Sequence, residues 1–579
     1  MTTETKQCQK CRATFVIEPE DFDFYRKIDV PPPTFCPDCR FQRRLTWRNE
    51  RTLYRRNDIF GRELLSIYDP IAGYKVMERD SWWSDAWDPM DYGTPYDQSV
   101  PFFSQFHGLL KTIPLSNVFS DNVVDSPYVN HVGYLKNCYL SFASWECENV
   151  IFGEKVVKTK DTLDAYLAWS SELCYEIVDC RNSQRLLFSR DCDGCMDSAF
   201  LYDCKNCSHC FGCVGLRNAQ YHIFNQPRSR EQYLAEVSES RFGSYATVGQ
   251  AKAEFSDFLM KYPRRFANLK NTINVTGDHC SNLKNCRDSF DLEDVEDSKF
   301  VIHGGLMMKD SYDGYGIGDS CEMLYEGIDT GVHGSKERFS VVVYTCQDTH
   351  YCFNCSSSSH LFACVGLRNK QYCILNTQYT KDEYEALIPR IKKHMDDMPY
   401  VDSKGREYKY GEFFPPELSP FAYNETIAQE YFPLTKDEAT QQGFRWRDPD
   451  TKEYKVTKTP DSLPDHIKDI DDSILQEVIG CSHKGTCSHQ CTTAFKIIPE
   501  ELSFYRRMNL PLPRLCPNCR HYERLKQRNP LKLWRRRCMC TQPTHQHGTG
   551  KCSNEFETSY APDRKEVVYC EGCYNAEVV

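Results

Sequence analysis

The chain has 579 residues, which is too long for one compact core and predicts several domains. Hydrophobic residues make up 40% of it and aromatic residues 13%, a composition that excludes a disordered chain. No apolar run reaches the roughly 18 residues that cross a bilayer, and the start, MTTETKQCQKC, lacks the apolar core of a signal peptide. We therefore expect a cytoplasmic protein that makes no membrane contact.

The net charge of −11 is unevenly distributed. Residues 40–62 carry +6 and residues 520–537 carry +7, which leaves −24 for the rest of the chain. Two basic segments attached to an acidic body predict either docking within the chain or contact with nucleic acid.

The first module, residues 1–62, contains two Cys-x2-Cys pairs, Cys8 with Cys11 and Cys36 with Cys39, separated by the segment 12–35. In a reducing compartment such pairs are more often metal ligands than disulfides. Four thiolates in two short turns suit a tetrahedral zinc site. The alternative is a set of buried free thiols.

A strand is expected at 13–17, and Pro37 is typical of a helix start. The arginines that follow recur at steps of 3, 1, 4, 3 and 4, which predicts one basic helix face. This face could contact phosphates, and its members are Arg40, Arg43, Arg44, Arg48, Arg51 and Arg55.

An aromatic-rich irregular segment, 63–133, precedes two similar units, 134–228 and 280–379. LKNCYLSF and CVGLRNAQYHIFN in the first unit recur as LKNCRDSF and CVGLRNKQYCILN in the second. Strand-sized segments with polar corners predict a parallel β-solenoid. The cysteine spacings of 36, 21 and 18 suggest rungs of about 18 to 21 residues. Helical segments are expected in 229–279 and 380–480, the latter also rich in Pro and aromatic residues.

Cys204, Cys207, Cys210 and Cys213 stand three residues apart, as iron–sulfur ligands can. In the second unit, however, Ser358 and Leu361 occupy the places of Cys207 and Cys210. Packing in the solenoid interior is therefore the favoured interpretation, with metal binding in the first unit as the alternative.

The second module, residues 481–537, repeats the first. When residues 15–40 are aligned with residues 495–520, 13 of 26 positions match. The predicted ligands are Cys487, Cys491, Cys516 and Cys519, with Cys481, His483 and His489 close enough to compete. The basic residues that follow are Arg520, Arg524, Arg528 and Lys532, with Pro530 interrupting the helix.

The third module, residues 538–579, has a more irregular cysteine pattern. Its predicted ligands are Cys540, Cys552, Cys570 and Cys573. Cys538, His545 and His547 remain alternatives.

Knuckle, β-hairpin and a helix that holds the second cysteine pair follow one another as in a treble clef. The two basic end modules resemble uncharacterised bacterial proteins with zinc-ribbon or treble-clef-like domains, through the pattern CxxC…F…FY…P…CPxCR. The resemblance covers somewhat under a third of the chain. It implies zinc binding and supplies no reaction.

The sequence thus predicts a multidomain, mainly β fold, with a parallel β-solenoid of two tandem units, helical insertions and small zinc modules at both termini. About three structural zinc ions are expected. The favoured function is a scaffold or protein-interaction protein whose zinc modules cap the solenoid, since open ends invite aggregation. Binding of RNA or DNA through the basic helices is the second hypothesis, and a zinc- or thiol-dependent enzyme the third.

Overall fold

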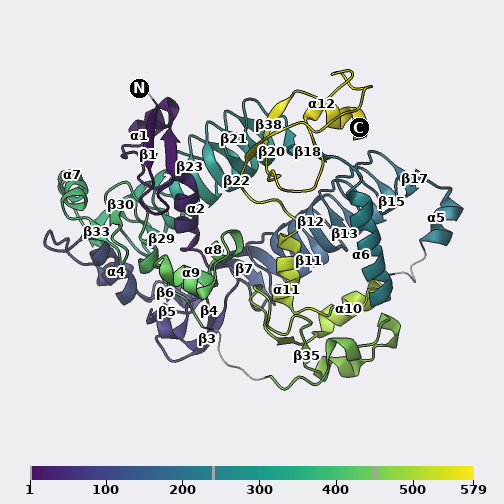
Figure 1. Cartoon of the computed structure of the whole chain (residues 1–579). Helices are drawn as coiled ribbons and strands as arrows, with labels where there is room; N and C mark the ends of the chain where they lie inside the picture. The colour runs from purple at the N-terminus through teal and green to yellow at the C-terminus, as the bar shows by residue number, and fades with distance from the viewer. Residues whose placement is uncertain (1–2, 238–241, 449–453, 579) are drawn as a thin grey trace.

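The computed structural model describes residues 3–237, 242–448 and 454–578. Two parallel β-solenoid units form the body, and the smaller modules pack against them (Figure 1). The mainly β fold and the solenoid predicted from the sequence are confirmed. The exact domain boundaries stay a prediction. Among the described residues, no helix is both long and apolar enough to span a bilayer.

The first solenoid unit contains one sheet of eleven strands. These are β7 (Ser120–Val124), β8 (Val132–Lys136), β9 (Glu148–Ile151), β10 (Glu154–Val157), β11 (Lys160–Trp169), β12 (Tyr175–Arg181), β13 (Gln184–Arg190), β14 (Met196–Ala199), β15 (Ser208–Phe211), β16 (Gln220–Ile223) and β17 (Gln226–Pro227).

The second unit contains a sheet of fourteen strands. These are β19 (Leu269–Lys270), β20 (Gly277–Lys284), β21 (Ser289–Glu296), β22 (Lys299–Lys309), β23 (Tyr312–Ile317), β24 (Cys321–Glu322), β25 (Tyr325–Val332), β26 (Ser335–Arg338), β27 (Val341–Tyr344), β28 (Gln347–His350), β29 (Phe353–Ser356), β30 (Ser359–Phe362), β31 (Gln371–Ile374) and β32 (Thr377–Gln378).

The register of the first solenoid unit gives the length of its rungs. Tyr175 pairs in parallel with Leu187, and Met196 with Ser208, so each rung places a residue beside the one twelve positions later. The longer rung expected from the cysteine spacing is therefore wrong. Those spacings of 36, 21 and 18 are all multiples of three, but only the first is a multiple of the rung length. They reflect a shorter repeat within the rung.

That shorter repeat is a triplet. From Asn137 through Leu140, Ala143 and Glu146 to Asn149, every third residue has a φ between 47° and 55°, in the left-handed region. Each rung therefore turns four times. Asn and Asp tolerate this conformation best among residues with a side chain, which explains the polar corners seen in the sequence.

From Cys138 to Cys213, the residue that follows each left-handed corner is buried inside the solenoid. Cys138, Cys147 and Cys174 occupy such positions, and all belong to one buried interior cluster. Their thiols donate to backbone carbonyls two residues earlier; for example, Cys138 Sγ lies 3.4 Å from the Lys136 oxygen. Small side chains with one donor therefore fit this narrow interior.

Corner residues on successive rungs also form hydrogen-bonded ladders. Asn149 accepts from Asn137 at 3.1 Å and donates to Asp161 at 3.0 Å. Asn149→Val is expected to lower the free energy of unfolding by about 1–2 kcal/mol, because a β-branched residue resists the left-handed region. Asn149→Gly, which keeps the turn, should cost less than Asn149→Val. Equal losses in denaturant unfolding would show that the corner conformation is not the cause.

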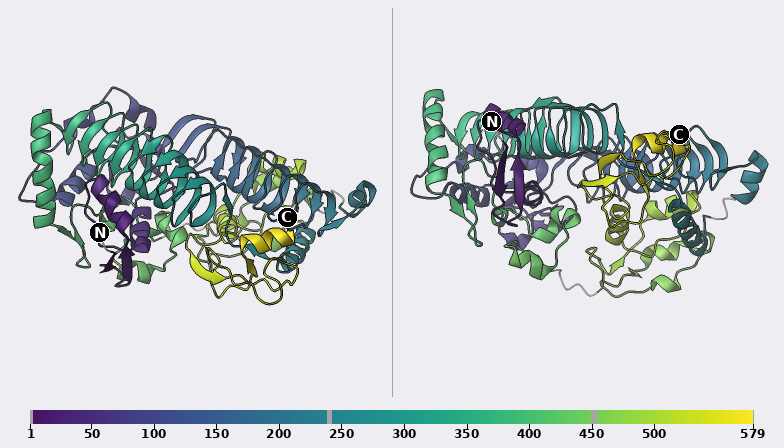
Figure 2. Two further views of the ribbon diagram at one scale, coloured as in Figure 1. Left: turned by 90° about the horizontal axis from the view of Figure 1, so that it is seen from above. Right: turned by 45° about the horizontal axis from the view of Figure 1, so that its top comes forward.

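The two solenoid units lie side by side and run in opposite directions (Figure 2). His131, near the start of the first unit, contacts Asp329 of the second at 2.7 Å. Further along the first unit, Arg181 pairs with Glu293, which comes earlier in the second unit, at 3.0 Å. The units overlap over only part of their lengths.

Helices follow both units, as the sequence predicted. They are α5 (Arg230–Glu236) and α6 (Tyr245–Leu259) after the first unit and α7 (Lys381–Asp397) after the second. The other helices are α1 (Pro19–Lys27), α2 (Pro37–Leu45), α3 (Arg79–Trp83), α4 (Phe102–Thr112), α8 (Ala428–Tyr431), α9 (Lys436–Gln441), α10 (Pro499–Arg507), α11 (Pro517–Leu525) and α12 (Glu571–Val578).

The first two modules pack on the sides of the solenoids. Helix α2 of the first module contacts β23 and β25 of the second unit, and α11 of the second module contacts β11 and β12 of the first unit. At the last strands, α5 contacts β16 and α7 contacts β31. The expectation that these two modules cap the solenoid ends is therefore wrong. Their helices carry buried arginines, and carboxylates on the solenoid flanks neutralise these charges.

Candidate metal centres

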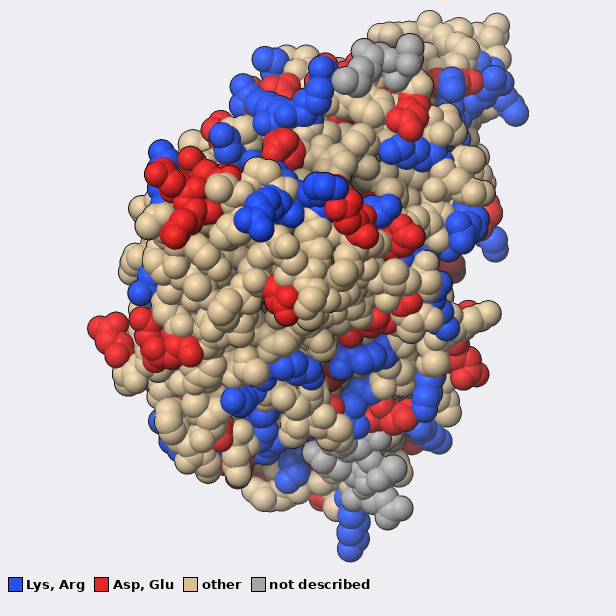
Figure 3. Space-filling model, turned by 90° about the vertical axis from the view of Figure 1, so that its left-hand side faces the viewer, with Lys and Arg blue, Asp and Glu red and all other residues tan. Residues whose placement is uncertain are grey.

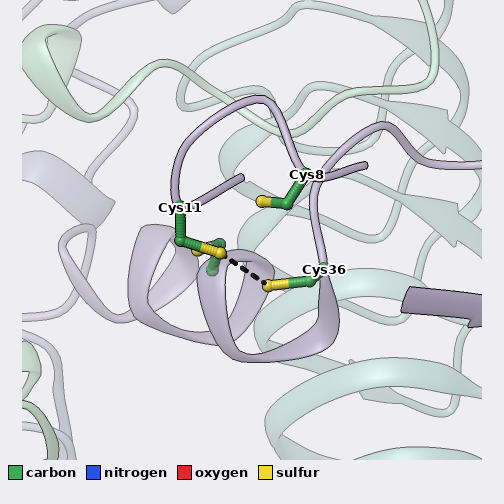
Figure 4. Close-up of side chains that lie close together, drawn as sticks. Cys8, Cys11 and Cys36 are labelled. Carbon is green, nitrogen blue, oxygen red and sulfur yellow. Dashed lines mark hydrogen bonds between the residues drawn. The ribbon is translucent and has the colours of Figure 1, made fainter. Parts of the chain in front are cut away.

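The first cysteine cluster forms where a hairpin turn faces a helix start. Cys8 and Cys11 lie in the turn between β1 (Glu4–Gln7) and β2 (Thr14–Ile17). Cys36 is the N-cap of α2, and Cys39 lies in its first turn. The four sulfur atoms lie within 4.8 Å of one another, and in Figure 4 the three labelled side chains point toward a common centre.

These separations suit a tetrahedral zinc ion. Four Zn–S bonds of about 2.3 Å place neighbouring sulfurs about 3.8 Å apart, and Cys11 Sγ lies 3.7 Å from Cys36 Sγ. All 32 cysteines of the chain are free in the structure. An all-thiolate donor set is soft and fits zinc.

The second cluster differs by one residue from the predicted set. Cys491, Cys516 and Cys519 lie together as expected, but the fourth member is Cys481. The sulfur of Cys481 lies 3.8 Å from that of Cys519, and Cys516 Sγ lies 3.9 Å from Cys491 Sγ. Cys487 instead groups with His483, His489 and Cys519.

The third cluster shows a similar exchange. Cys552, Cys570 and Cys573 lie together as predicted, and their fourth partner is Cys538. Cys552 Sγ is 3.9 Å from Cys570 Sγ. Cys540 groups with the histidines His545 and His547 and with Cys573.

A shared local structure explains why Cys481 and Cys538 take these places. Each first cysteine directly follows a short strand that pairs with a strand after the knuckle, namely β1 with β2, β35 (Ile479–Gly480) with β36 (Ala494–Phe495), and β37 (Trp534–Arg537) with β38 (Glu555–Thr558). The amide of that cysteine donates to a carbonyl two residues beyond the last cysteine of the knuckle. The three bonds are Cys8 to Ala13 at 2.9 Å, Cys481 to Thr493 at 2.8 Å and Cys538 to Asn554 at 2.9 Å. A short strand ending at a cysteine was therefore the sequence signal that the spacing argument missed.

Hydrogen bonds favour the thiolate form of Cys570, a member of the third cluster. Burial raises the pKa of Cys570, but bonds from the Cys573 backbone and the Asn554 side chain outweigh it, so the pKa falls to about 7. Asn554 Nδ2 donates to Cys570 Sγ at 3.4 Å. The thiolate is the form that binds metal.

The basic residues after the first cluster are largely buried. Helix α2 ends at Leu45, so the single helix face predicted for residues 40–55 does not form, and Arg55 lies in β3 (Tyr54–Asn57). Arg40 and Arg44 both contact Asp313 of the second solenoid unit, at 2.8 and 3.0 Å. Tertiary ion pairs thus override the helical pattern.

The remaining arginines of this group also form ion pairs. Arg43 pairs with Glu326 and Glu412, Arg48 with Glu50 and Asp329, and Arg51 with Glu154. Arg55 is exposed and pairs with Glu63 at 3.2 Å.

The second module repeats this arrangement, mainly on the first solenoid unit. Arg520 and Arg524 contact Asp164 of the first unit at 2.6 and 2.5 Å. Arg528 contacts Asp179 of the first unit and Asp291 of the second. The exposed Lys532 pairs with Asp38 of the first module at 2.9 Å.

These ion pairs correspond to docking within the chain, one of the two alternatives that the charge distribution predicted. A nucleic acid could not reach the buried guanidinium groups of Arg40, Arg44, Arg520 and Arg524 in this structure. On the face shown in Figure 3, basic and acidic side chains are interspersed. These positions give no support to phosphate binding.

The four cysteines spaced three apart are interior residues of the first unit. Cys204, Cys207, Cys210 and Cys213 are all buried and belong to the interior cluster. Cys204 and Cys213 donate to the carbonyls of Tyr202 and Phe211, at 3.5 and 3.3 Å. Each occupies a place that the triplet repeat gives to a small inward side chain.

A large cavity lies between the first solenoid unit, α6 and the second module. Its volume is about 760 Å³, and Phe188 of β13, Phe200 and Phe255 of α6 line it. A smaller polar cavity of about 20 Å³, enough for about one water molecule, contains Asp179, Asp191 and His279. Of these two, the larger one falls within the roughly 300–1,000 Å³ range typical of ligand sites.

Together these features define the class of protein: a mainly β protein with a solenoid body and several cysteine clusters that could bind metal ions. No model of a known protein family matches the chain, and no curated protein matches it either.

Proposed function

We propose that the chain is a zinc-stabilised, non-catalytic scaffold that binds a protein partner. The observation that carries this proposal is the closed donor set of the first cluster, Cys8, Cys11, Cys36 and Cys39. Structural zinc sites have four protein ligands, whereas catalytic ones keep a position open for water or substrate. The likeness of the end modules to bacterial zinc-ribbon and treble-clef-like domains supports the same role.

The docking of the modules supports a structural role for the metal. The first and second clusters each lie at the start of a helix, α2 or α11, whose arginines contact buried carboxylates on the solenoid flank. Zinc would hold the helix start in place and so align these arginines with their buried carboxylates. In the reducing cytoplasm, where we place the protein, thiols remain available for metal.

For the binding role, we propose the cavity of about 760 Å³ as the contact site. Its lining is mixed, with the half-buried rings of Phe188 and Phe255 beside charged side chains such as Glu523, and it suits a partner segment that carries both an apolar anchor and charged residues. Lys252 Nζ lies 4.8 Å from the Phe188 ring centroid at one side.

Phe255→Glu should weaken partner binding while leaving the solenoid folded, because it removes an aromatic anchor from the cavity and adds a charge in its place. Phe258→Glu is a matched control, since Phe258 lies on the same helix and is half-buried but does not line the cavity. The measurement is quantitative affinity purification, followed by cross-linking to locate the contact. We expect at least a tenfold loss of a stoichiometric partner with Phe255→Glu only. Nucleic acid in place of a protein partner would contradict the proposal.

A further inference from the structure

We propose that the second and third modules each hold two zinc ions that share one thiolate, Cys519 or Cys573. This inference rests on the proposed zinc function and extends it. In these two modules, a second group of four donors within 4.8 Å of one another lies beside the four-cysteine cluster. The second groups are His483, Cys487, His489 and Cys519 in one module, and Cys540, His545, His547 and Cys573 in the other.

The shared residue is the last cysteine of each module. Cys519 belongs both to the group with Cys481 and to the group with Cys487. Its sulfur lies 3.8 Å from Cys481 Sγ and 3.7 Å from Cys487 Sγ. Both separations match the edge of about 3.8 Å expected of a zinc–sulfur tetrahedron, so one sulfur stands at a corner of two tetrahedra.

The third module has donor contacts of the same kind. Cys540 Sγ lies 3.1 Å from His545 Nδ1 and 3.4 Å from His547 Nε2. Zn–N bonds are shorter than Zn–S bonds, about 2.0–2.1 Å, so N···S edges are shorter than S···S edges. Cys573 completes this group and is also the last member of the four-cysteine cluster.

The donor residues of the two groups follow one another along the chain in the same order in both modules. The first and last residues of the knuckle, Cys481 and Cys491, or Cys538 and Cys552, belong to the four-cysteine group. The three inner donors of the knuckle belong to the second group. The first module has only Gln9 and Lys10 between its knuckle cysteines, so it offers a natural single-ion comparison.

Unpaired polar atoms mark the second group of the second module. Within the described part of the chain, Nδ1 of His483 and Nδ1 of His489 are buried and make no hydrogen bond. Leaving a buried polar atom without a partner costs about 1–3 kcal/mol, and coordination would remove that cost.

Charge balance also favours two ions. Each module contributes five cysteines and two histidines to its two groups. One divalent ion balances two of the five thiolate charges, whereas two ions balance four. Excess charge in a buried cluster is costly, so the second ion stabilises the complete donor set.

The test is the metal content of the full-length protein, measured by native mass spectrometry and elemental analysis. We expect five zinc ions per chain. The double variant His483→Ala/His489→Ala should hold four, because the four-thiolate group remains intact. His394→Ala is the matched control: its ring nitrogens are also buried and unpaired, but it belongs to neither second group, so it should hold five.

Sharing is tested separately on the unaltered chain loaded with ¹¹³Cd. A bridging thiolate should give cadmium–cadmium coupling for two pairs of ions, with the ion of the first module uncoupled. Cys519→Ser should release two ions, whereas Cys8→Ser should release one. Five ions without coupling would overturn the sharing. Three ions would overturn the inference and leave the proposed function standing, and a metal-free folded chain would overturn both.

Discussion

Asp313→Asn is expected to lower the free energy of unfolding by about 3–5 kcal/mol, because it leaves two buried guanidinium groups without a counter-charge. Arg40 and Arg44 contact the two carboxylate oxygens of Asp313, and all three residues are buried. Burial alone would raise the pKa of Asp313, but the two arginines hold it below its usual value, so the carboxylate is ionised. The measurement is denaturant unfolding of the zinc-loaded protein.

Glu63→Gln serves as the control for this prediction. It removes the partner of Arg55 in an exposed pair, and such pairs contribute about 0–1 kcal/mol. Asp164→Asn should repeat the large loss, since Asp164 holds Arg520 and Arg524 in the same way. If Asp313→Asn and Glu63→Gln had similar effects, the docking interface would not depend on buried charge.

Cys36→Ser is expected to cost the chain one zinc ion and to unfold the first module. A structural zinc site contributes on the order of 10 kcal/mol or more of apparent binding free energy to its module. Cys36 also caps α2, the helix that presents Arg40, Arg43 and Arg44 to the solenoid. Loss of the module would leave the buried carboxylates of the solenoid without counter-charges, so we expect the melting temperature of the solenoid to fall as well.

The matched control is the same exchange inside the solenoid, Cys207→Ser. Cys207 donates to the Lys205 carbonyl, and Ser358 in the second unit makes the equivalent bond to Ser356 at 2.8 Å. The variant should therefore retain all of its zinc and nearly all of its stability. Metal content and thermal unfolding of both variants provide the comparison. Normal zinc content in Cys36→Ser would contradict the assignment of this ligand.

The sequence predicted the elements that local chemistry determines. Cys36 and Pro37 indicated a helix start, and α2 begins at Pro37. The internal duplication also predicted the two solenoid units, because the same residues recur at similar spacing. The strand expected at 13–17 is observed as β2, Thr14–Ile17.

The rung length escaped prediction because cysteine is only one of several small residues that fill the solenoid interior. Ser141 and Val150 occupy places equivalent to those of Cys138 and Cys147, so cysteine spacing skips positions. The informative signal was the corner residue every third position, as from Asn137 to Asn149.

The positions of the arginines depended on tertiary contacts. The periodic spacing from Arg40 to Arg55 suggested one long helix. Instead, α2 ends at Leu45, and Arg48, which lies beyond that end, contacts Asp329. No local pattern shows that a carboxylate from a distant part of the chain will neutralise a buried guanidinium. The grouping of Cys481 with Cys491, Cys516 and Cys519 likewise depends on the pairing of β35 with β36.

The most direct test of the account is native mass spectrometry of the full-length protein, purified without added metal, before and after chelation. The account predicts zinc in each of the three modules, and loss of the module folds when the zinc is removed. A chain that carries no metal and still keeps α2 and α11 docked on the solenoid flanks would contradict it.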